Sequence, residues 1–241
     1  MTMAPFRHVV ILTGAGISAD SGIATFRDPD GVWARYDLED LATPEAFERN
    51  PAFVHEFYND RHAKLAHVEP NPAHTALARL EAHHPGEVLI VTQNVDDLHE
   101  RGAAAKVIHM HGEMRKARCR DKGTVLDWDG ALGVDLACPC CGATGALRPH
   151  VVWFGEMPLF MDRIGAALAA CDLFVSIGTS GSVYPAAGFV EEVRASGAAH
   201  TVELNLEASA GGALFAERIL GRAAEIVPAY VARLLAEAGS V

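Results

Sequence analysis

The sequence has 241 residues, half of them apolar, and a formal net charge of −11. This length suits one large domain with an inserted module and a sizeable core. No apolar stretch approaches the roughly 20 residues of a membrane span, and the acidic chain has no run of Lys or Arg, which argues against direct contact with nucleic acid. Met1–Arg7 lacks the pattern of a signal peptide, so we expect a cytoplasmic protein with no membrane partner.

Strand-like and helix-like patterns alternate along the chain. The predicted strands are His8–Leu12, Glu87–Thr92, Asp172–Ile177 and Ala199–Leu204, and the predicted helices are Pro72–His83, Met161–Ala170, Ala186–Ser196 and Pro228–Ala238. This alternation predicts an α/β fold with a doubly wound, parallel, Rossmann-like sheet. Ligands bind such sheets at the carboxyl ends of the strands, so we expect the polar residues after each strand to gather in one crevice.

Two segments interrupt the alternation. Thr43–Glu69 has helical spacing, and Cys119–Pro149 is rich in Gly, Cys and Asp with little periodicity. We interpret both as insertions, at about 28–70 and 113–149, which form a smaller module within a single domain spanning 1–241.

The first predicted strand is followed by GAGISADSGIATFRDPDG, which begins like the G-x-G-x-x-A loop of a dinucleotide-binding fold. Glycines there let the backbone approach a pyrophosphate. Two more glycines and a proline then replace the usual helix, which predicts a long loop. The glycines alone are also compatible with a simple tight turn. Polar residues after three other strands favour a nucleotide site, with Phe26, Arg27 and Asp28 near the ligand.

Two other polar clusters follow predicted strands. Gln93, Asn94 and Asp96 can hold ribose hydroxyls or a carboxamide, but Asn94 or Asp96 can equally cap a helix, and the pattern alone favours the cap. In the segment VIHMHG, His109 and His111 lie on the same face of an extended chain. A single histidine is usually structural. His111 stands at a strand end, however, where a neutral imidazole can remove a proton from a sugar hydroxyl near pH 7.

Six segments in this order, GAGISADSGIATFRD, TQNVD, HMHG, HVVWFGE, GTS and NLE, resemble the motifs of the sirtuin family of NAD-dependent protein deacylases. The resemblance runs from about Val9 to the last helix and is closest to the compact bacterial type that carries Tyr-x-x-Arg. It implies that NAD is the cofactor and that acylated lysine-containing proteins or peptides are the partners. The acyl oxygen attacks the anomeric carbon while the nicotinamide–ribose bond breaks, giving free lysine, nicotinamide and O-acyl-ADP-ribose.

The resemblance also implies roles for individual residues around the cofactor. His111 matches the general base, and Phe26 and Arg27 lie on a mobile loop that folds over NAD. The other implied cofactor contacts are Gly14, Ala15, Gly16, Ile17, Gln93, Asn94, Asp96, Gly178, Thr179, Ser180, Asn205, Leu206, Glu207 and Ala223.

Two segments, VVWFGE and GSVYPAA, resemble those that clamp the substrate peptide as an added strand, which implies contacts from Phe154, Gly155 and Val183. Burial in the core is the alternative for Trp153 and Phe154, and their position beside Gly155 favours the clamp for Phe154.

The segment FYNDR suggests the acyl group. Arg61 interrupts an apolar helical stripe that includes Tyr58, and an inward arginine is unfavourable unless an anion meets it. Pairing with Glu56 or Asp60, or a side chain that extends to water, is the structural alternative. Tyr58 and Arg61 match the motif of sirtuins that remove succinyl and malonyl groups, which predicts desuccinylation alongside deacetylation.

Four of the five cysteines lie between Cys119 and Cys141, which suggests a metal site. Most sirtuins carry C-x-x-C twice and bind zinc with the four thiolates. Here Lys122 replaces one ligand, and Cys140 is an extra cysteine beside Cys138. The resemblance implies zinc bound by Cys119, Cys138 and Cys141, with Cys140 available as a fourth ligand, and a metal-free module held by packing is equally compatible.

Three other functions share the glycine loop. A nicotinamide-dependent dehydrogenase is disfavoured, because none of the four tyrosines begins a Tyr-x-x-x-Lys pair and no acidic residue is cleanly placed after a second strand. A non-catalytic NAD or ADP-ribose sensor would not need His111. Mono-ADP-ribosyl transfer to protein shares the bond cleavage and stays open.

Overall fold

A computed structural model describes residues 6–25, 38–197 and 199–239. Its main feature is a six-stranded sheet of order β3-β2-β1-β7-β8-β9 in which all neighbours are parallel. The strands are β1 (His8–Thr13), β2 (Glu87–Thr92), β3 (Val107–His109), β7 (Leu173–Ile177), β8 (His200–Asn205) and β9 (Glu217–Leu220). The predicted parallel α/β sheet is confirmed.

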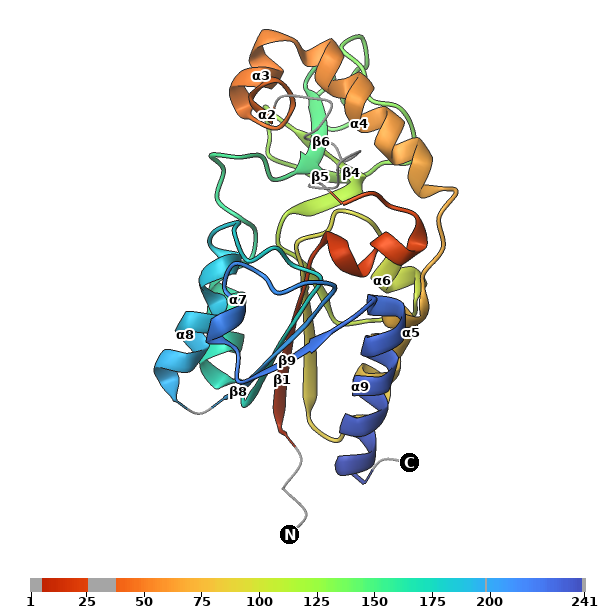
Figure 1. Ribbon diagram of the computed structural model, residues 1–241. Helices are drawn as coiled ribbons and strands as arrows, with labels where there is room; N and C mark the ends of the chain where they lie inside the picture. Colours follow the sequence, from red (N-terminus) through yellow and green to blue (C-terminus); the bar gives the residue numbers. More distant parts are fainter. Residues whose placement is uncertain (1–5, 26–37, 198, 240–241) are drawn as a thin grey trace.

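Helices cover both faces of this sheet (Figure 1). They are α5 (Pro72–His83) and α9 (Ala223–Glu237) on one face, and α7 (Met161–Ala170) and α8 (Phe189–Ser196) on the other. Strand β1 explains the arrangement, because alternate side chains point to opposite faces. Val9 and Ile11 join the core formed with α5 and α9, whereas Val10 and Leu12 join the core formed with α7 and α8.

The two insertions come together above the carboxyl ends of the strands (Figure 1). They contain α2 (Leu38–Leu41), α3 (Pro44–Arg49), α4 (Pro51–Leu65) and a three-stranded antiparallel sheet, β5-β4-β6, with β4 (Gly112–Cys119), β5 (Val125–Asp127) and β6 (Leu147–Val151). Phe47, Tyr58, Met114 and Trp153 form a core between these helices and this sheet. The division into one domain with a smaller module stays a prediction.

Local capping explains why residues 44–65 of the first insertion form two separate helices, α3 and α4. Thr43 Oγ1 accepts the N–H of Ala46 at 3.0 Å, and Asn50 Oδ1 accepts the N–H of Phe53 at 3.2 Å. A proline follows each cap at the first helical position, where its missing N–H is not needed.

The structure differs from the predicted elements in several places. The last helix begins at Ala223 instead of Pro228, because Ala224 N–H bonds to the Asp20 carboxylate and the first turn forms ahead of the proline. Strands β4, β5, β6 and β9 were missed. Charged residues interrupt the apolar positions of β4 and β6, and β5 and β9 are short and partly exposed. The helix predicted from Ala186 opens with a 3-10 turn, η3 (Ala186–Gly188).

The chain after β1 forms two 3-10 turns, η1 (Ala15–Ile17) and η2 (Ala19–Ser21), in place of a helix, as the glycines predict. The remaining short elements are α6 (Leu98–Arg101) and the 3-10 turn η4 (Gly212–Leu214). In the described part of the chain, no helix combines the length and apolar composition needed to cross a bilayer.

Candidate active site

The glycine loop and the loop after β7 meet at the carboxyl edge of the large sheet. Gly14 N–H donates to Ile177 O at 3.0 Å, and Gly16 N–H donates to Gly178 O at 2.9 Å. A Cβ at Gly14 would lie 2.8 Å from Gly178 O, and one at Gly16 would lie 2.7 Å from Gly178 Cα. Glycine is therefore needed at both positions for the loop after β1 to lie against the backbone at Gly178. The contact lies where the connections from β1 and β7 run to opposite sides, the usual ligand position in such sheets.

Ser18 joins this loop to the segment after β2. Its fully buried hydroxyl donates to Asp96 Oδ2 at 3.1 Å and accepts from Asn94 Nδ2 at 3.1 Å. Asp96 also accepts the N–H of Leu98 at 3.2 Å, but the N-cap residue of α6 is Asp97, whose side chain makes no capping bond, so Asp96 is not the predicted helix cap. Burial raises the pKa of Asp96. Ser18 was not among the predicted site residues, and its only signal in the sequence is its place within the glycine loop.

Two buried histidines, His74 and His99, lie beside the hydrogen bonds that Ser18 makes. His74 Nδ1 accepts the N–H of Asn71 at 3.2 Å, which leaves the proton on Nε2, 3.4 Å from Ser18 Oγ. His99 Nε2 lies 3.0 Å from Thr13 Oγ1. Burial lowers the pKa of His74 to about 4 and lowers that of His99 well below its ordinary value. Both rings are therefore neutral near pH 7.

His111 is held in one tautomer. Its Nδ1 lies 3.1 Å from the backbone oxygen of Gln93. A carbonyl oxygen can only accept, so Nδ1 carries the proton and Nε2 keeps its lone pair. Burial lowers the pKa of His111 and outweighs the opposing effect of the Gln93 bond. A neutral imidazole with a free Nε2 has the form that a general base requires near pH 7.

His109, two residues earlier, is protonated where His111 is neutral. Its Nδ1 lies 3.1 Å from Asn94 O and its Nε2 lies 2.8 Å from Glu100 Oε1. Both oxygens accept when Glu100 is ionised, so both ring nitrogens donate and the ring is an imidazolium. Burial alone lowers the pKa of His109, but the hydrogen bond and charge of Glu100 outweigh it and raise the pKa. The pKa of Glu100 is lowered in turn, since the bond to His109 outweighs its desolvation.

This pair predicts a pH-dependent contribution to stability. The raised pKa of His109 gives stability that is fully present below the ordinary value of 6.5 and is lost as pH rises through the folded-state pKa. The lowered pKa of Glu100 gives stability that is present above 4.5 and is lost as pH falls through the folded-state pKa. The contribution is therefore largest between these two ordinary values.

We expect Glu100→Gln to destabilise the fold by about 1 kcal/mol more near pH 6 than near pH 9, a modest figure because the Glu100 side chain is 44% exposed. Urea unfolding at several pH values measures this difference, with the exposed-residue variant Glu192→Gln on α8 as control. Equal destabilisation by Glu100→Gln at both pH values would contradict the charged pair.

The helix α4 brings Tyr58 to the segment after β6. Tyr58 is buried, and its hydroxyl accepts the indole N–H of Trp153 at 3.0 Å, which leaves the hydroxyl proton to donate. Arg61 is half-buried, and its guanidinium lies 5.4 Å from the centre of the Phe57 ring. Burial lowers the pKa of Arg61. Asp60 forms its ion pair with Lys64, at 2.6 Å.

The two aromatics of VVWFGE have different environments. Trp153 is 3% exposed and belongs to the core, whereas Phe154 is 44% exposed and Gly155 is also at the surface. An ion pair that was not predicted from the sequence also shapes this segment. Arg148 binds both carboxylate oxygens of Glu156, at 2.6 and 2.9 Å, and stacks 3.4 Å from the Trp153 ring.

The other expected cofactor residues lie at strand ends or near them. Asn205, the last residue of β8, donates to Thr179 O at 2.7 Å, and Ala223 begins α9. The remaining predicted residues here are half-buried Val183 and exposed Ser180, Leu206 and Glu207. Phe26, Arg27 and Asp28 lie outside the described residues.

Four cysteine sulfurs converge beside β4. The Sγ atoms of Cys119, Cys138, Cys140 and Cys141 all lie within 4.8 Å of one another. Two of the separations are 3.7 Å, between Cys119 and Cys141, and 3.3 Å, between Cys138 and Cys140. A tetrahedral zinc ion with Zn–S distances of about 2.3 Å requires S···S separations of about 3.8 Å, so this donor set fits zinc.

Comparisons with known proteins extend this picture. Residues 14–185 match the model described as the Sir2 family. A Caulobacter vibrioides protein named NAD-dependent protein deacylase is 58% identical over 95% of this chain and 97% of its own length. A Vibrio cholerae protein of the same name is 55% identical over 96% of this chain and 95% of its own.

Solved structures resemble the whole fold. A Sir2 homologue in complex with NAD has a TM-score of 0.87 and 38% identity, covering 97% of this chain and 91% of the other. A Sir2 protein bound to acetylated peptide has a TM-score of 0.81 and 26% identity, covering 98% of this chain and 95% of the other. The family match runs from the glycine loop to the residues after β7, so it includes most of the strand-end crevice. The chain belongs to the Sir2 family.

Proposed function

We propose that the protein is an NAD-dependent protein-lysine deacylase. The observation that carries the proposal is the state of His111, whose Nδ1 is held by the backbone oxygen of Gln93 after β2 and whose Nε2 keeps its lone pair. The relatives named NAD-dependent protein deacylase, and the homologue solved with NAD, support NAD as the cofactor. The homologue bound to acetylated peptide supports an acylated peptide as the substrate.

In this proposal, NAD contributes a ribose carbon bonded to a cationic leaving group. The acyl oxygen of the lysine attacks that carbon, the carbon–nitrogen bond breaks, and nicotinamide leaves as a neutral molecule. His111 Nε2 takes the proton of a ribose hydroxyl, and the oxygen of that hydroxyl attacks the acyl carbon. The bond from the acyl carbon to the lysine nitrogen then breaks, so that the amine leaves, and one water molecule adds to the acyl carbon, which leaves the acyl group as an ester on the sugar. Asn94 and Asp96, fixed by Ser18, face the ribose and the nicotinamide. The products are free lysine, nicotinamide and O-acyl-ADP-ribose.

The cofactor's phosphates and adenosine lie along the strand ends in this proposal. The backbone of the glycine loop binds the pyrophosphate. Further contacts come from Gly178, Thr179, Ser180, Asn205, Leu206, Glu207 and Ala223. The peptide is held as an added strand between Phe154–Gly155 and Val183, which places the acyl oxygen in line with the ribose.

The acyl pocket in this proposal admits both acetyl and succinyl groups. The Tyr58 hydroxyl already accepts a hydrogen bond, so it retains a proton for a carboxylate. An arginine one helical turn later can bind the same carboxylate with two parallel hydrogen bonds. A pocket long enough for succinyl still accommodates acetyl.

We also propose that the cysteine cluster holds a structural zinc ion. Cys140 supplies the fourth thiolate, because Lys122 stands where most sirtuins have a cysteine ligand. We expect the purified protein to contain about one zinc per chain, and Cys138→Ala to lose it and to melt several degrees lower, since a structural metal contributes directly to folding. Elemental analysis and a melting curve measure both effects. Cys171→Ala, far from the cluster, should keep its zinc. Absence of zinc together with an unchanged melting temperature in Cys138→Ala would favour a metal-free module.

A mass-spectrometric assay tests the activity. Acetyl-, succinyl- and longer acyl-lysine peptides are incubated with and without NAD, and free lysine peptide, nicotinamide and O-acyl-ADP-ribose are quantified. Appearance of all three products only with NAD supports deacylation. Production of reduced cofactor, or of ADP-ribosylated protein without deacylated peptide, would instead identify a dehydrogenase or an ADP-ribosyltransferase. A cytoplasmic location without nucleic-acid contact stays a prediction.

A further inference from the structure

Two histidine side chains bind neighbouring carbonyls in the segment that follows β2. His111 Nδ1 lies 3.1 Å from Gln93 O. His109 Nδ1 lies 3.1 Å from the next backbone oxygen, that of Asn94. The third carbonyl, that of Val95, accepts a backbone N–H of β4 at 2.8 Å. The chain from the end of β3 into β4 therefore binds three consecutive backbone oxygens of this segment.

The bound segment carries two of the side chains that are proposed to face the cofactor. Asn94 and Asp96 are both buried, and both bond to the hydroxyl of Ser18. The carbonyls of Gln93 and Asn94 belong to adjacent peptide groups. A displacement at Asn94 O would therefore also displace Gln93 O, which holds the tautomer of His111. One backbone bond from His109 thus supports the proposed cofactor contacts and the proposed base.

Glu100 keeps His109 in the form that makes this bond. The ring of His109 is buried, and its Nε2 lies 2.8 Å from Glu100 Oε1. A neutral imidazole has one N–H and can donate to only one of the two oxygens, whereas an imidazolium donates to both. When one proton leaves, the other stays with the charged acceptor, since hydrogen bonds to ions are the stronger ones. Deprotonation therefore breaks the bond to Asn94 O and retains the bond to Glu100.

The groups around this ion pair favour the protonated ring. Those that are titratable or charged come from three elements, namely Asp96 after β2, His99 and Glu100 on α6, and Glu113 and Lys116 on β4. Burial lowers the pKa of His109, but the hydrogen bond and charge of Glu100, the Asn94 carbonyl and the charge of Glu113 together raise it above 6.5. His99 is kept neutral by burial.

We propose that His109 is a positioning residue for the deacylase reaction and that Glu100 keeps it in its protonated form. The ring fixes the backbone oxygen of Asn94, and this orients Asn94 and Asp96 toward the cofactor and keeps Gln93 O on the Nδ1 proton of His111. The inference rests on the proposed function and adds to it a second histidine, which acts through the backbone.

Two substitutions of His109 separate the two bonds of the ring. An asparagine nitrogen can take the place of Nδ1 and donate to Asn94 O, while Glu100, whose side chain is 44% exposed, stays solvated. A glutamine nitrogen lies one bond further out, so it takes the place of Nε2 and leaves Asn94 O without its donor. We expect His109→Gln to weaken NAD binding and to lower kcat/KM for acetyl-lysine peptide about tenfold, and His109→Asn to change each about threefold at most. Calorimetric titration and steady-state kinetics measure these effects.

The pH profile tests the role of the proton. In the unmodified protein, kcat/KM should fall at least about threefold from pH 7 to pH 9, because a group with a raised pKa loses its proton as pH rises. In Glu100→Gln, a neutral His109 can donate to Asn94 O and accept from the amide that replaces the carboxylate, so both bonds survive and the decline should be absent. NMR titration of the His109 ring, assigned through His109→Asn, locates its pKa in each protein.

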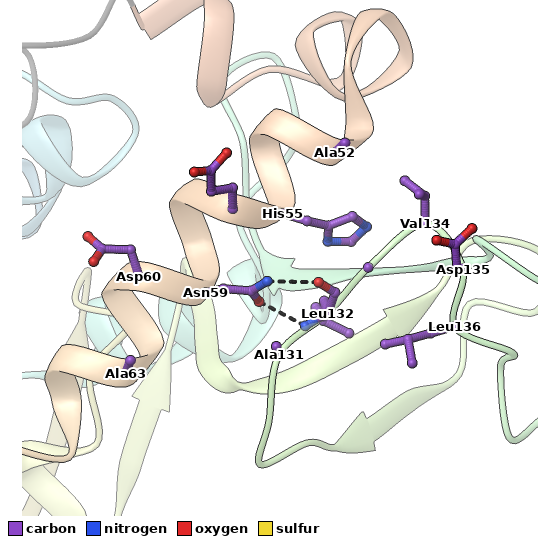
Figure 2. Close-up of a pocket in the computed structure, with 12 residues that line it drawn as sticks. Ala52, His55, Asn59, Asp60, Ala63, Ala131, Leu132, Val134, Asp135 and Leu136 are labelled. Atoms are coloured by element: carbon purple, nitrogen blue, oxygen red, sulfur yellow. Dashed lines mark hydrogen bonds between the residues drawn. The ribbon is translucent and has the colours of Figure 1, made fainter.

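The control for lost stability alone is Asn59→Ala on α4. The Asn59 side chain donates to Leu132 O and accepts Leu132 N–H, both at 2.8 Å, beside a cavity of the small module (Figure 2). Its removal breaks two hydrogen bonds between segments far apart in sequence and leaves the segment after β2 intact. Asn59→Ala should therefore lower the melting temperature without changing the NAD affinity or the pH profile.

Three results would overturn the proposal. His109→Gln binds NAD as well as the unmodified protein, or His109→Asn is impaired as much as His109→Gln, and either would remove the bond to Asn94 O. The decline toward pH 9 is absent from the unmodified protein or equal in Glu100→Gln, which would remove the proton of His109. Glu100→Gln removes no hydrogen bond, so it decides the question if a His109 variant does not fold. Absence of deacylation in the unmodified protein would refute the proposed function alone, because the NAD affinities are measured without turnover.

Discussion

Replacing His111 with alanine is expected to lower the turnover of acyl-lysine peptide about 100-fold or more while NAD binds nearly as well. The reason is the position of one proton. The Gln93 carbonyl holds the proton on Nδ1 and leaves Nε2 with the lone pair that the proposed base needs. Alanine removes that base but leaves the glycine loop and its contact with Gly178 in place. Single-turnover kinetics with acetyl-lysine peptide, together with calorimetric titration of NAD, measure the two effects separately.

A matched variant separates loss of the base from loss of stability. His83→Ala alters a histidine at the exposed end of α5 and should leave turnover unchanged. Equal melting temperatures for both variants would exclude unfolding as the cause of a lower rate. Turnover of His111→Ala close to that of the unmodified protein would remove His111 from the mechanism, and weak NAD binding in that variant would assign the residue to the cofactor site instead.

The large sheet could be predicted because the apolar composition of its central strands is visible in the sequence. All five residues of β7 are buried, so burial on both faces produces a mostly apolar run, interrupted by Ser176 and followed by polar residues. Strand β9 lies at the edge of the sheet, where half-buried and exposed residues alternate over four positions, and it carries no comparable signal. The start of α9 was misplaced because Pro228 is typical of a first helical turn, whereas an interaction with Asp20, 204 residues away, stabilises an earlier start.

The predicted site residues come from short motifs at strand ends, but their supports come from elsewhere. Ser18 and Asp96 are 78 residues apart, and Ser18 and His74 are 56 apart. Such contacts have no period and no fixed spacing, so only the folded chain reveals them. Arg148 and Glu156 are close in sequence, but their ion pair could not be predicted either. It is positioned by the Trp153 ring, which packs against the Arg148 guanidinium only in the folded chain. Cys140 could be suspected from its neighbours, yet its place among three other sulfurs required the structure.

The proposed acyl preference depends on a pair of residues that the sequence suggests through helical spacing. Tyr58 and Arg61 lie one turn apart on α4, and the stripe that contains them has Val54 and Leu65 buried on either side. Asp60 binds Lys64, but its charge also acts on Arg61, so the alternative that Asp60 accounts for the inward arginine stays open. Burial raises the pKa of Tyr58 to about 12, so its hydroxyl stays protonated and can donate. A hydroxyl and a guanidinium together form a set of donors suited to a carboxylate at the end of an acyl chain.

Arg61→Met is therefore expected to raise the Michaelis constant for succinyl-lysine peptide about tenfold or more and to change that for acetyl-lysine peptide little. Methionine keeps the length and apolar contacts of the side chain and removes its charge, and a hydrogen bond to a charged group contributes about 1.5–3 kcal/mol. Arg61→Lys should retain part of the succinyl preference, because lysine keeps the charge without the two parallel donors. Arg163→Met on α7, an exposed arginine on the other layer, serves as control. Equal responses of both substrates to Arg61→Met would assign Arg61 to the structure of α4 and leave the carboxylate unrecognised.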